Sequence, residues 1–107
     1  MLQETSNVFL IGFMGTGKTR LGKKLAPKLG LQFVDLDQYI ESKTNLTISQ
    51  LFLKYGEAEF RHLESNYLHE LIQTPHQLIS CGGGTPIFHN NMQSLLSHGL
   101  VIYLESS

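Results

Sequence analysis

The stretch from residue 8 to residue 21 constrains the fold of this chain more than any other. An unbroken apolar run, VFLI, is followed directly by GFMGTGKT and then by residues that suit a helix. The letters fit the pattern G-x-x-x-x-G-K-[ST] without a mismatch, and this pattern binds phosphate when a strand precedes it and a helix follows. A flexible glycine-rich turn with a solvated lysine is the weaker alternative, because both flanking elements are predicted here.

Each fixed position of this loop has a physical reason. Gly12, Gly15 and Gly17 allow several backbone N–H groups to converge on one phosphate, because no Cβ atom stands in the way. The helix that follows leaves its first N–H groups unpaired and carries a partial positive charge at that end. Lys18 would reach the β and γ phosphates of a nucleoside triphosphate, and Thr19 would offer its hydroxyl to the accompanying Mg²⁺.

Composition limits the other roles of the chain. Its 107 residues, 41% hydrophobic and 16% charged, suit one globular domain, and no apolar run is long enough to span a membrane. A net charge of −1 with dispersed Lys and Arg gives no general attraction to nucleic acid. The single cysteine excludes an internal disulfide, and the N-terminus lacks the regions of a signal peptide. We therefore expect a cytoplasmic protein without nucleic-acid or membrane partners. We also expect a monomer.

Four short segments predict strands, at residues 8–11, 32–35, 77–80 and 100–104. The first and last are continuous apolar runs, which are typical of strands buried on both faces of a parallel sheet. The helix after the first strand should have Leu21 and Leu25 on one face, and Gly30 should close it. Pro27 predicts a kink or an early end in this helix.

Two carboxylates follow the second predicted strand. Residues two apart in an extended chain face the same way, so Asp35 and Asp37 can point into one crevice at the carboxyl end of the strand. Ligands usually bind at this end of parallel sheets. The alternative is that Asp37 only caps a short helix over residues 38–42, and the sequence supports both interpretations equally.

The middle of the chain predicts two consecutive helices. Residues 47–50 form a capping box, Gly56 should break or bend the run, and a longer helix should begin near Glu57. Glu57, Arg61 and Glu64 lie three and four apart on this helix, which by spacing alone favours a solvated ladder of ion pairs. The opposite, apolar face would consist of Phe60, Leu63, Tyr67, Leu68, Leu71 and Ile72.

Three consecutive glycines follow the third predicted strand. Gly82, Gly83 and Gly84 offer no side chains to pack, which favours close approach of a ligand to bare backbone. Cys81 before them is interpreted as a small buried hydrophobe. A last helix, capped by Asn90 and ended by Gly99, should present one apolar face made of Met92, Leu95 and Leu96.

Four ordered motifs, GFMGTGKT, FVDLDQYIE, GEAEFRHLE and ISCGGG, resemble the shikimate kinase family. The resemblance implies an α/β, P-loop NTPase-like three-layer sandwich with a parallel sheet. Residues 1–107 would form a single P-loop kinase core domain with four strands, truncated before the C-terminal lid and fifth strand of the family. The implied reaction transfers the γ-phosphoryl of ATP to the 3-hydroxyl of shikimate, in aromatic amino-acid biosynthesis. The alternatives are another small-metabolite kinase, such as gluconate kinase, or a non-catalytic nucleotide-binding fragment.

The resemblance also implies roles for individual residues. The residues binding ATP would be Gly15, Thr16, Gly17, Lys18, Thr19 and Arg20, and those binding shikimate Asp37, Arg61, Glu64, Gly82, Gly83 and Gly84. Lys18 and Asp37 would be catalytic, with Asp37 accepting the proton of the attacking hydroxyl. Thr19 would ligate Mg²⁺ directly and Asp35 would order its outer shell. Arg61 would pair the shikimate carboxylate, and Glu64 would orient Arg61.

Two departures from the family pattern affect these expectations. Cys81 stands where the family usually has a threonine, so a thiol replaces a hydroxyl near the phosphates. The chain also stops before the lid, whose arginine would lie over the phosphates. We therefore expect the 107-residue chain by itself to be inactive.

Overall fold

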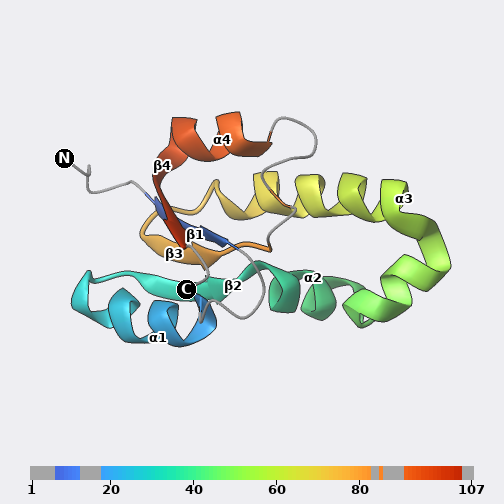
Figure 1. Cartoon of the computed structure of the whole chain (residues 1–107), viewed down its shortest axis with the longest axis horizontal. Helices are drawn as coiled ribbons and strands as arrows, with labels where there is room; N and C mark the ends of the chain where they lie inside the picture. Colours follow the sequence, from blue (N-terminus) through green and yellow to red (C-terminus); the bar gives the residue numbers. More distant parts are fainter. Residues whose placement is uncertain (1–6, 13–17, 83–84, 86–90, 105–107) are drawn as a thin grey trace.

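Four parallel strands form the centre of the molecule, in the order β2-β3-β1-β4 (Figure 1). The computed structural model describes residues 7–12, 18–82, 85 and 91–104, without the side chains of Lys18, Thr19 and Leu104. The strands are β1 Asn7–Gly12, β2 Gln32–Asp35, β3 Gln77–Ser80 and β4 Gly99–Leu104. All four predicted strands and their parallel arrangement are confirmed.

The sheet separates two apolar cores because side chains alternate along β1. Val8 and Leu10 pack with Ala26 of the first helix on one face. Phe9 and Ile11 belong to the larger core on the other face. Every residue of β1 is buried, as the unbroken apolar run predicts. The result is a three-layer arrangement of helix, sheet and helix.

The fourth strand differs from its prediction in burial. Leu100 is 47% exposed and Tyr103 is 51% exposed, although the apolar run predicts a strand buried on both faces. Among the described strands, β4 pairs only with β1 and lies at the edge of the sheet. An edge position leaves side chains without a neighbouring strand to cover them, which explains the exposure.

The first helix, α1, spans Lys18–Lys28 and packs through its smallest residues. A Cβ at Gly22 would lie 2.3 Å from the ring of Phe33, and Ala26 is buried, whereas Leu21 is exposed. The predicted apolar face was therefore wrong in including Leu21, because a close helix–sheet approach favours Gly and Ala. The helix ends one residue after Pro27, which confirms the predicted early end.

Gly30 closes α1, as predicted. Its φ is +69°, and its N–H donates to the carbonyl of Pro27 at 3.2 Å. The N–H of Leu31 donates to the carbonyl of Ala26 at 2.8 Å. These two bonds form a Schellman motif, which satisfies carbonyls that the end of the helix leaves open.

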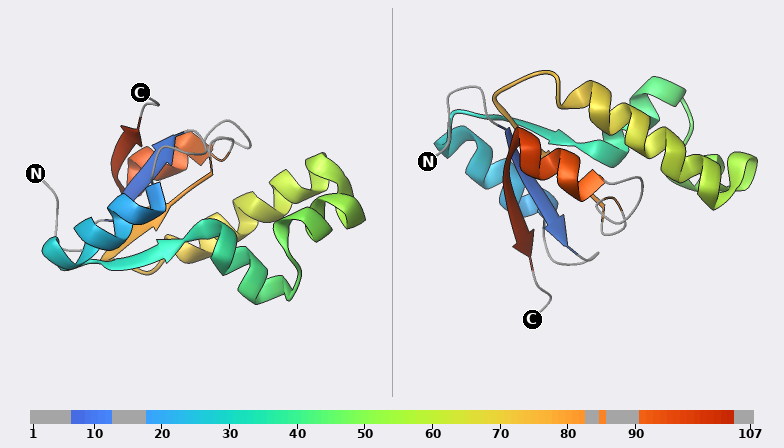
Figure 2. Two further views of the ribbon diagram at one scale, coloured as in Figure 1. Left: turned by 60° about the horizontal axis from the view of Figure 1, so that its bottom comes forward. Right: turned by 90° about the horizontal axis from the view of Figure 1, so that it is seen from above.

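Helix α2 Leu36–Thr44 leads away from the sheet, and the second half of α3 Ile48–Leu71 returns to it (Figures 1 and 2). The predicted capping box is confirmed, because Thr47 and Gln50 each accept a hydrogen bond from the other's backbone N–H. Gly56 divides α3 with a φ of +83°, at the predicted break. No helix in the part of the chain that the structure describes is both long and apolar enough to cross a membrane.

Helix α4 spans Asn91–His98 and lies on the same side of the sheet as the second half of α3 (Figure 1). Leu95 is buried, but Leu96 is 62% exposed, so the predicted apolar face was wrong in including it. The buried partner on this face is Asn91, four residues before Leu95. The predicted cap, Asn90, lies outside the described residues.

Candidate active site

The carboxyl ends of β1, β2 and β3 bring the predicted site residues to one edge of the sheet. Gly12 ends β1 with a φ of 148°, a conformation that favours glycine, and α1 begins at Lys18. The strand and the helix predicted on either side of the phosphate loop are therefore confirmed. The predicted residues Gly15, Thr16, Gly17, Gly83 and Gly84 lie outside the described residues.

Asp35, rather than Asp37, caps α2. Its side chain accepts a 3.1 Å hydrogen bond from the backbone N–H of Gln38, and its backbone is extended. The interpretation that Asp37 caps this helix was wrong. The extended-chain argument for a shared crevice also fails, because α2 already begins at Leu36. Asp37 instead lies in the first turn of α2, one residue into the helix.

The carboxyl group of Asp37 lies among other charged groups. Although the residue has substantial contact with solvent, desolvation by the surrounding protein is the largest cause that raises its pKa from 3.8 to about 6. Repulsion from the carboxylates of Asp35, Glu64 and Glu41 raises the pKa further. The guanidinium of Arg61 acts in the opposite direction. The aspartates are thus electrostatic neighbours, and the Arg61–Glu64 pair belongs to the same site.

The predicted ladder of solvated ion pairs was wrong for two of its three members. Nη1 of Arg61 lies 3.1 Å from Oε1 of Glu64, and the two side chains are only 17% and 2% exposed. Glu57 is exposed, as the ladder interpretation expects. Arg61 and Glu64 lie in the second half of α3, whose apolar side chains pack against the sheet. This packing, rather than the spacing of the charges, shields the pair from solvent.

In addition to Glu64, two aromatic rings lie beside the guanidinium of Arg61. The rings of Phe52 and Phe60 stack with centroids 4.5 Å apart. The central carbon of the guanidinium lies 5.9 Å and 5.4 Å from the respective centroids. Cation–π attraction at these distances restricts the guanidinium to one region. Arg61 is therefore held in place before any ligand arrives.

A chain of buried hydrogen bonds continues from Glu64. Oγ1 of Thr85 donates to Oε2 of Glu64 at 2.8 Å. Nδ2 of Asn91 donates to the carbonyl of Thr85 at 2.7 Å, and Oγ of Ser65 donates to Oδ1 of Asn91 at 2.9 Å. Thr85, Asn91 and Ser65 are not among the residues that the sequence predicts for the site. Their separation along the chain gives no periodic signal, and only their polarity within apolar surroundings could have drawn attention.

The segment that follows β3 begins as predicted. Cys81 is buried and its N–H donates to the carbonyl of Leu10 at 2.8 Å, so it extends the sheet as a small apolar residue. At Gly82 an added Cβ would meet only Oγ1 of Thr85, at 3.5 Å, which is an ordinary contact. The described packing therefore does not require a glycine at position 82.

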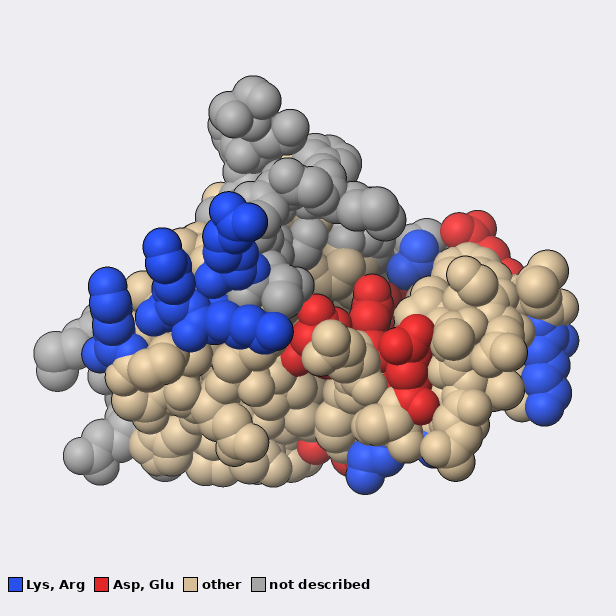
Figure 3. All heavy atoms as spheres, turned by 90° about the horizontal axis from the view of Figure 1, so that it is seen from below, with Lys and Arg blue, Asp and Glu red and all other residues tan. Residues whose placement is uncertain are grey.

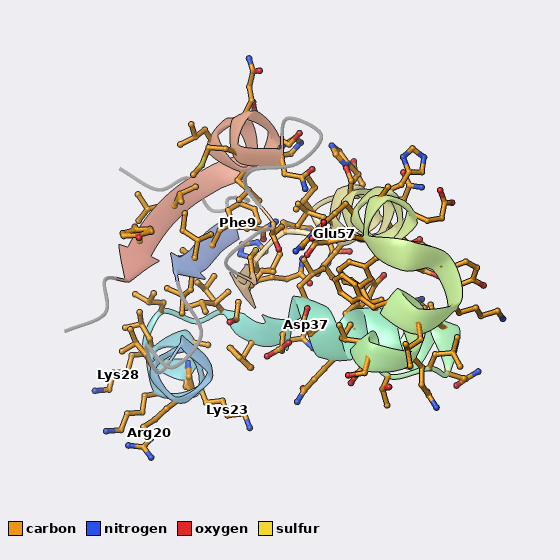
Figure 4. All side chains as sticks on the ribbon, turned by 45° about the vertical axis from the view of Figure 1, so that its right-hand side comes forward. Phe9, Arg20, Lys23, Lys28, Asp37 and Glu57 are labelled. Atoms are coloured by element: carbon orange, nitrogen blue, oxygen red, sulfur yellow. The ribbon has the colours of Figure 1, made fainter. Side chains whose placement is uncertain are left out.

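A basic surface covers α1 next to this site. Its side chains are all exposed, and they are Arg20, Lys23, Lys24 and Lys28. Figure 3 shows blue side chains gathered at the left, where α1 lies, with red side chains beside them. Arg20, Lys23 and Lys28 extend outward from α1 in Figure 4, while Asp37 lies at the start of α2.

The fold and the site together define a class of protein. A parallel α/β sheet and a glycine-ended β1 that leads to α1 are typical of P-loop proteins, and acidic groups beside a partly buried arginine suit a small-molecule kinase of this class. A family model for shikimate kinase matches residues 14–107. The chain belongs to the shikimate kinase family.

Similar proteins agree with this membership. A shikimate kinase of Parabacteroides distasonis is 48% identical over 100 residues, covering 94% of this chain and 58% of the relative. A crystal structure of the Bacteroides thetaiotaomicron shikimate kinase matches with a TM-score of 0.90 and 46% identity, over 94% of this chain and 57% of that one. Acinetobacter baumannii shikimate kinase in complex with shikimate matches with a TM-score of 0.91 and 40% identity, over 96% and 57%. The chain thus spans less than two thirds of the length of these relatives.

Proposed function

We propose that this chain forms the core of an ATP-dependent shikimate kinase, which transfers the γ-phosphoryl group of ATP to the 3-hydroxyl of shikimate. One observation carries the proposal: a partly buried arginine, held by Glu64 and two aromatic rings, shares a site with the carboxyl of Asp37. The two groups suit a substrate that carries both a carboxylate and a reactive hydroxyl. The Acinetobacter relative, which binds shikimate, supports the same substrate.

Arg61 would bind the carboxylate of shikimate. A guanidinium presents paired N–H donors that match the two oxygens of a carboxylate. Glu64 and the rings of Phe52 and Phe60 hold the guanidinium in place, so less side-chain freedom is lost when the substrate binds. Fixing one end of the ring positions the 3-hydroxyl at the other end for reaction.

Asp37 would accept the proton of the 3-hydroxyl. A pKa of about 6 is close to the pH at which a general base works best, and leaves the carboxylate ionised at neutral pH. As the hydroxyl oxygen forms its bond to the γ-phosphorus, the bond between that phosphorus and the β–γ bridging oxygen breaks, and ADP leaves. The hydroxyl proton moves to Asp37 during this displacement.

The phosphate loop would hold ATP through the backbone of residues 15–20, with Lys18 reaching the transferred group. The residues at this end of the sheet suit Mg²⁺. Asp35 lies at the carboxyl end of β2, and its carboxylate provides the hard oxygen atoms that this ion prefers. Thr19 would be the direct ligand and Asp35 would act through water. When bound, Mg²⁺ neutralises phosphate charge. Within the described ranges, no three His, Cys, Asp or Glu residues are grouped to bind a metal.

The glycines at 82–84 would lie against the ring of shikimate, with Gly83 donating a hydrogen bond. Gly82 supports this role, since its surroundings leave room for a Cβ that the chain nevertheless lacks. We further propose a monomeric, cytoplasmic enzyme in which residues 1–107 form one core domain. By itself the 107-residue polypeptide is proposed to be inactive, because it spans only 57% of the Bacteroides thetaiotaomicron enzyme.

A coupled assay of ADP release tests the proposed function. The full-length protein that carries this chain should release ADP in the presence of ATP, Mg²⁺ and shikimate, and release little with gluconate. Higher turnover of gluconate would favour the other small-metabolite kinase. Nucleotide binding without turnover of either compound would identify a non-catalytic protein. The 107-residue polypeptide, measured alongside, should give no shikimate-dependent release.

A further inference from the structure

Thr85 occupies a central place in the buried polar network, although it belongs to none of the binding motifs. We propose that Thr85 is a positioning residue: its hydroxyl sets the orientation of Glu64, and through Glu64 that of the substrate-binding Arg61. This inference rests on the proposed function. It gives Thr85, the residue after the three glycines, an indirect role in binding the carboxylate of the substrate.

The two oxygens of the Glu64 carboxylate bind different partners. Oε1 faces Nη1 of Arg61 at 3.1 Å, while Oε2 accepts the Thr85 hydroxyl at 2.8 Å. The side chain of Glu64 is buried, and Thr85 has no exposed surface. A carboxylate held at both oxygens cannot rotate without losing a charge-assisted hydrogen bond. The hydroxyl of Thr85 therefore fixes the direction in which Glu64 presents Oε1.

Thr85 is itself held by hydrogen bonds on both sides. Its N–H donates to the carbonyl of Gly82 at 3.2 Å, and its carbonyl accepts from Nδ2 of Asn91 at 2.7 Å. Asn91 in turn accepts from the hydroxyl of Ser65, the residue after Glu64. The hydrogen bonds thus leave α3 at Glu64 and return to it at Ser65, forming a closed ring. Because of this ring, a shift of α4 or of the Gly82 carbonyl would move Thr85 and, with it, the carboxylate of Glu64.

Opening this ring of hydrogen bonds would change what the guanidinium of Arg61 contacts. Arginine tends to engage both oxygens of a carboxylate. With the Thr85 hydroxyl removed, Oε2 of Glu64 would attract the guanidinium of Arg61 as a replacement donor. Arg61 would then turn toward Glu64 and away from the substrate. The expected consequence is weaker binding of shikimate without a direct effect on ATP.

The test compares two substitutions of Thr85 in the full-length protein. Thr85→Val keeps the shape but removes the hydroxyl, whereas Thr85→Ser keeps the hydroxyl. Thr85→Val should raise KM for shikimate by about tenfold or more, the scale of a lost hydrogen bond to a charged group. KM for ATP should stay within about twofold, a difference of roughly 0.4 kcal/mol. Thr85→Ser should bind shikimate as the parent does, and so should Ser97→Ala, which removes an exposed α4 hydroxyl bonded within its own helix.

Several results would overturn the inference. Thr85→Val with unchanged KM for shikimate would do so, and so would equal losses toward shikimate and ATP, which indicate a structural role only. Failure of Thr85→Ser to restore affinity would also contradict it. NMR spectra of the Arg61 guanidinium supply a readout without substrate: Thr85→Val should shift its signals and Thr85→Ser should not. A parent protein that lacks shikimate binding would refute the proposed function, whereas unshifted Arg61 signals would refute the positioning role itself.

Discussion

Nη1 of Arg61 and Oε1 of Glu64 lie 3.1 Å apart on consecutive turns of α3, in a place almost closed to solvent. A buried pair of this kind contributes little net stability, because removing both charges from water costs about as much as their attraction returns. Its value is geometric instead. Glu64 fixes a cation that would otherwise be a mobile side chain, and a fixed cation binds an anionic substrate with less loss of entropy.

Replacing Arg61 with lysine should therefore reduce activity even though the charge is kept. The ammonium group cannot donate two parallel hydrogen bonds to a carboxylate. We expect Arg61→Lys to lower kcat/KM for shikimate by at least about tenfold. Steady-state kinetics measure this, with the exposed Lys54→Arg as the control exchange. A change of less than about twofold, or 0.4 kcal/mol, would show that Arg61 does not contact the substrate.

Asp37 should control the pH dependence of both activity and stability. In its proposed role as general base Asp37 must be ionised, so kcat/KM should fall as the pH drops through about 6, and Asp37→Asn should lower turnover by about 100-fold or more. A raised pKa means that the folded state favours the protonated form. The contribution of Asp37 to stability should therefore fall as the pH rises from 3.8 to about 6.

Urea unfolding without nucleotide tests the second part of this prediction. Asp37→Asn removes the ionising group, so its advantage in unfolding free energy over the parent should grow across that pH range and then level off. Glu59→Gln, an exposed substitution on α3, serves as the control. A constant difference between Asp37→Asn and the parent at every pH would refute the raised pKa.

Lys18 is the first residue of α1, and in its proposed role it would supply a cation to the phosphates, so it should be needed for nucleotide binding. Calorimetry on Lys18→Ala should give an affinity for ATP with Mg²⁺ at least about tenfold weaker than that of the parent. Lys28→Ala, an exposed change at the other end of the same helix, should bind as the parent does. Unchanged affinity and turnover in Lys18→Ala would overturn the assignment of the phosphate loop.

Gly99 should be among the positions least tolerant of a side chain. A Cβ there would lie 1.8 Å from the carbonyl oxygen of Asn7, and backbone cannot move aside as a flexible side chain can. We expect Gly99→Ala to lower the free energy of unfolding by about 3 kcal/mol. Gly30→Ala, where φ is +69° but no atom lies within 4 Å, should cost only about 1–2 kcal/mol. Denaturant titrations that rank the two variants in the opposite order would contradict the contact.

The sequence by itself determined the elements of the fold and their order. The apolar runs of β1 and β3, the capping box at Thr47 and the glycines at 30 and 56 act over a few residues, so their effect can be read locally. Family motifs in the right order also predicted a shared role for Asp37 and Arg61, and the structure brings these two residues close enough to interact electrostatically. These features depend on neighbours in the chain, which a sequence displays directly.

Only the tertiary structure decided which polar residues are buried and what they contact. The spacing of Arg61 and Glu64 is the same on a solvated helix as on a buried one, and α3 buries them because it packs on the sheet. Thr85 reaches Glu64 across 21 positions, and Asn91 reaches Ser65 across 26. Leu100 and Tyr103 are likewise exposed because β4 is the outermost of the described strands. Burial and long-range hydrogen bonds arise from the packing of distant segments, and no local pattern encodes them.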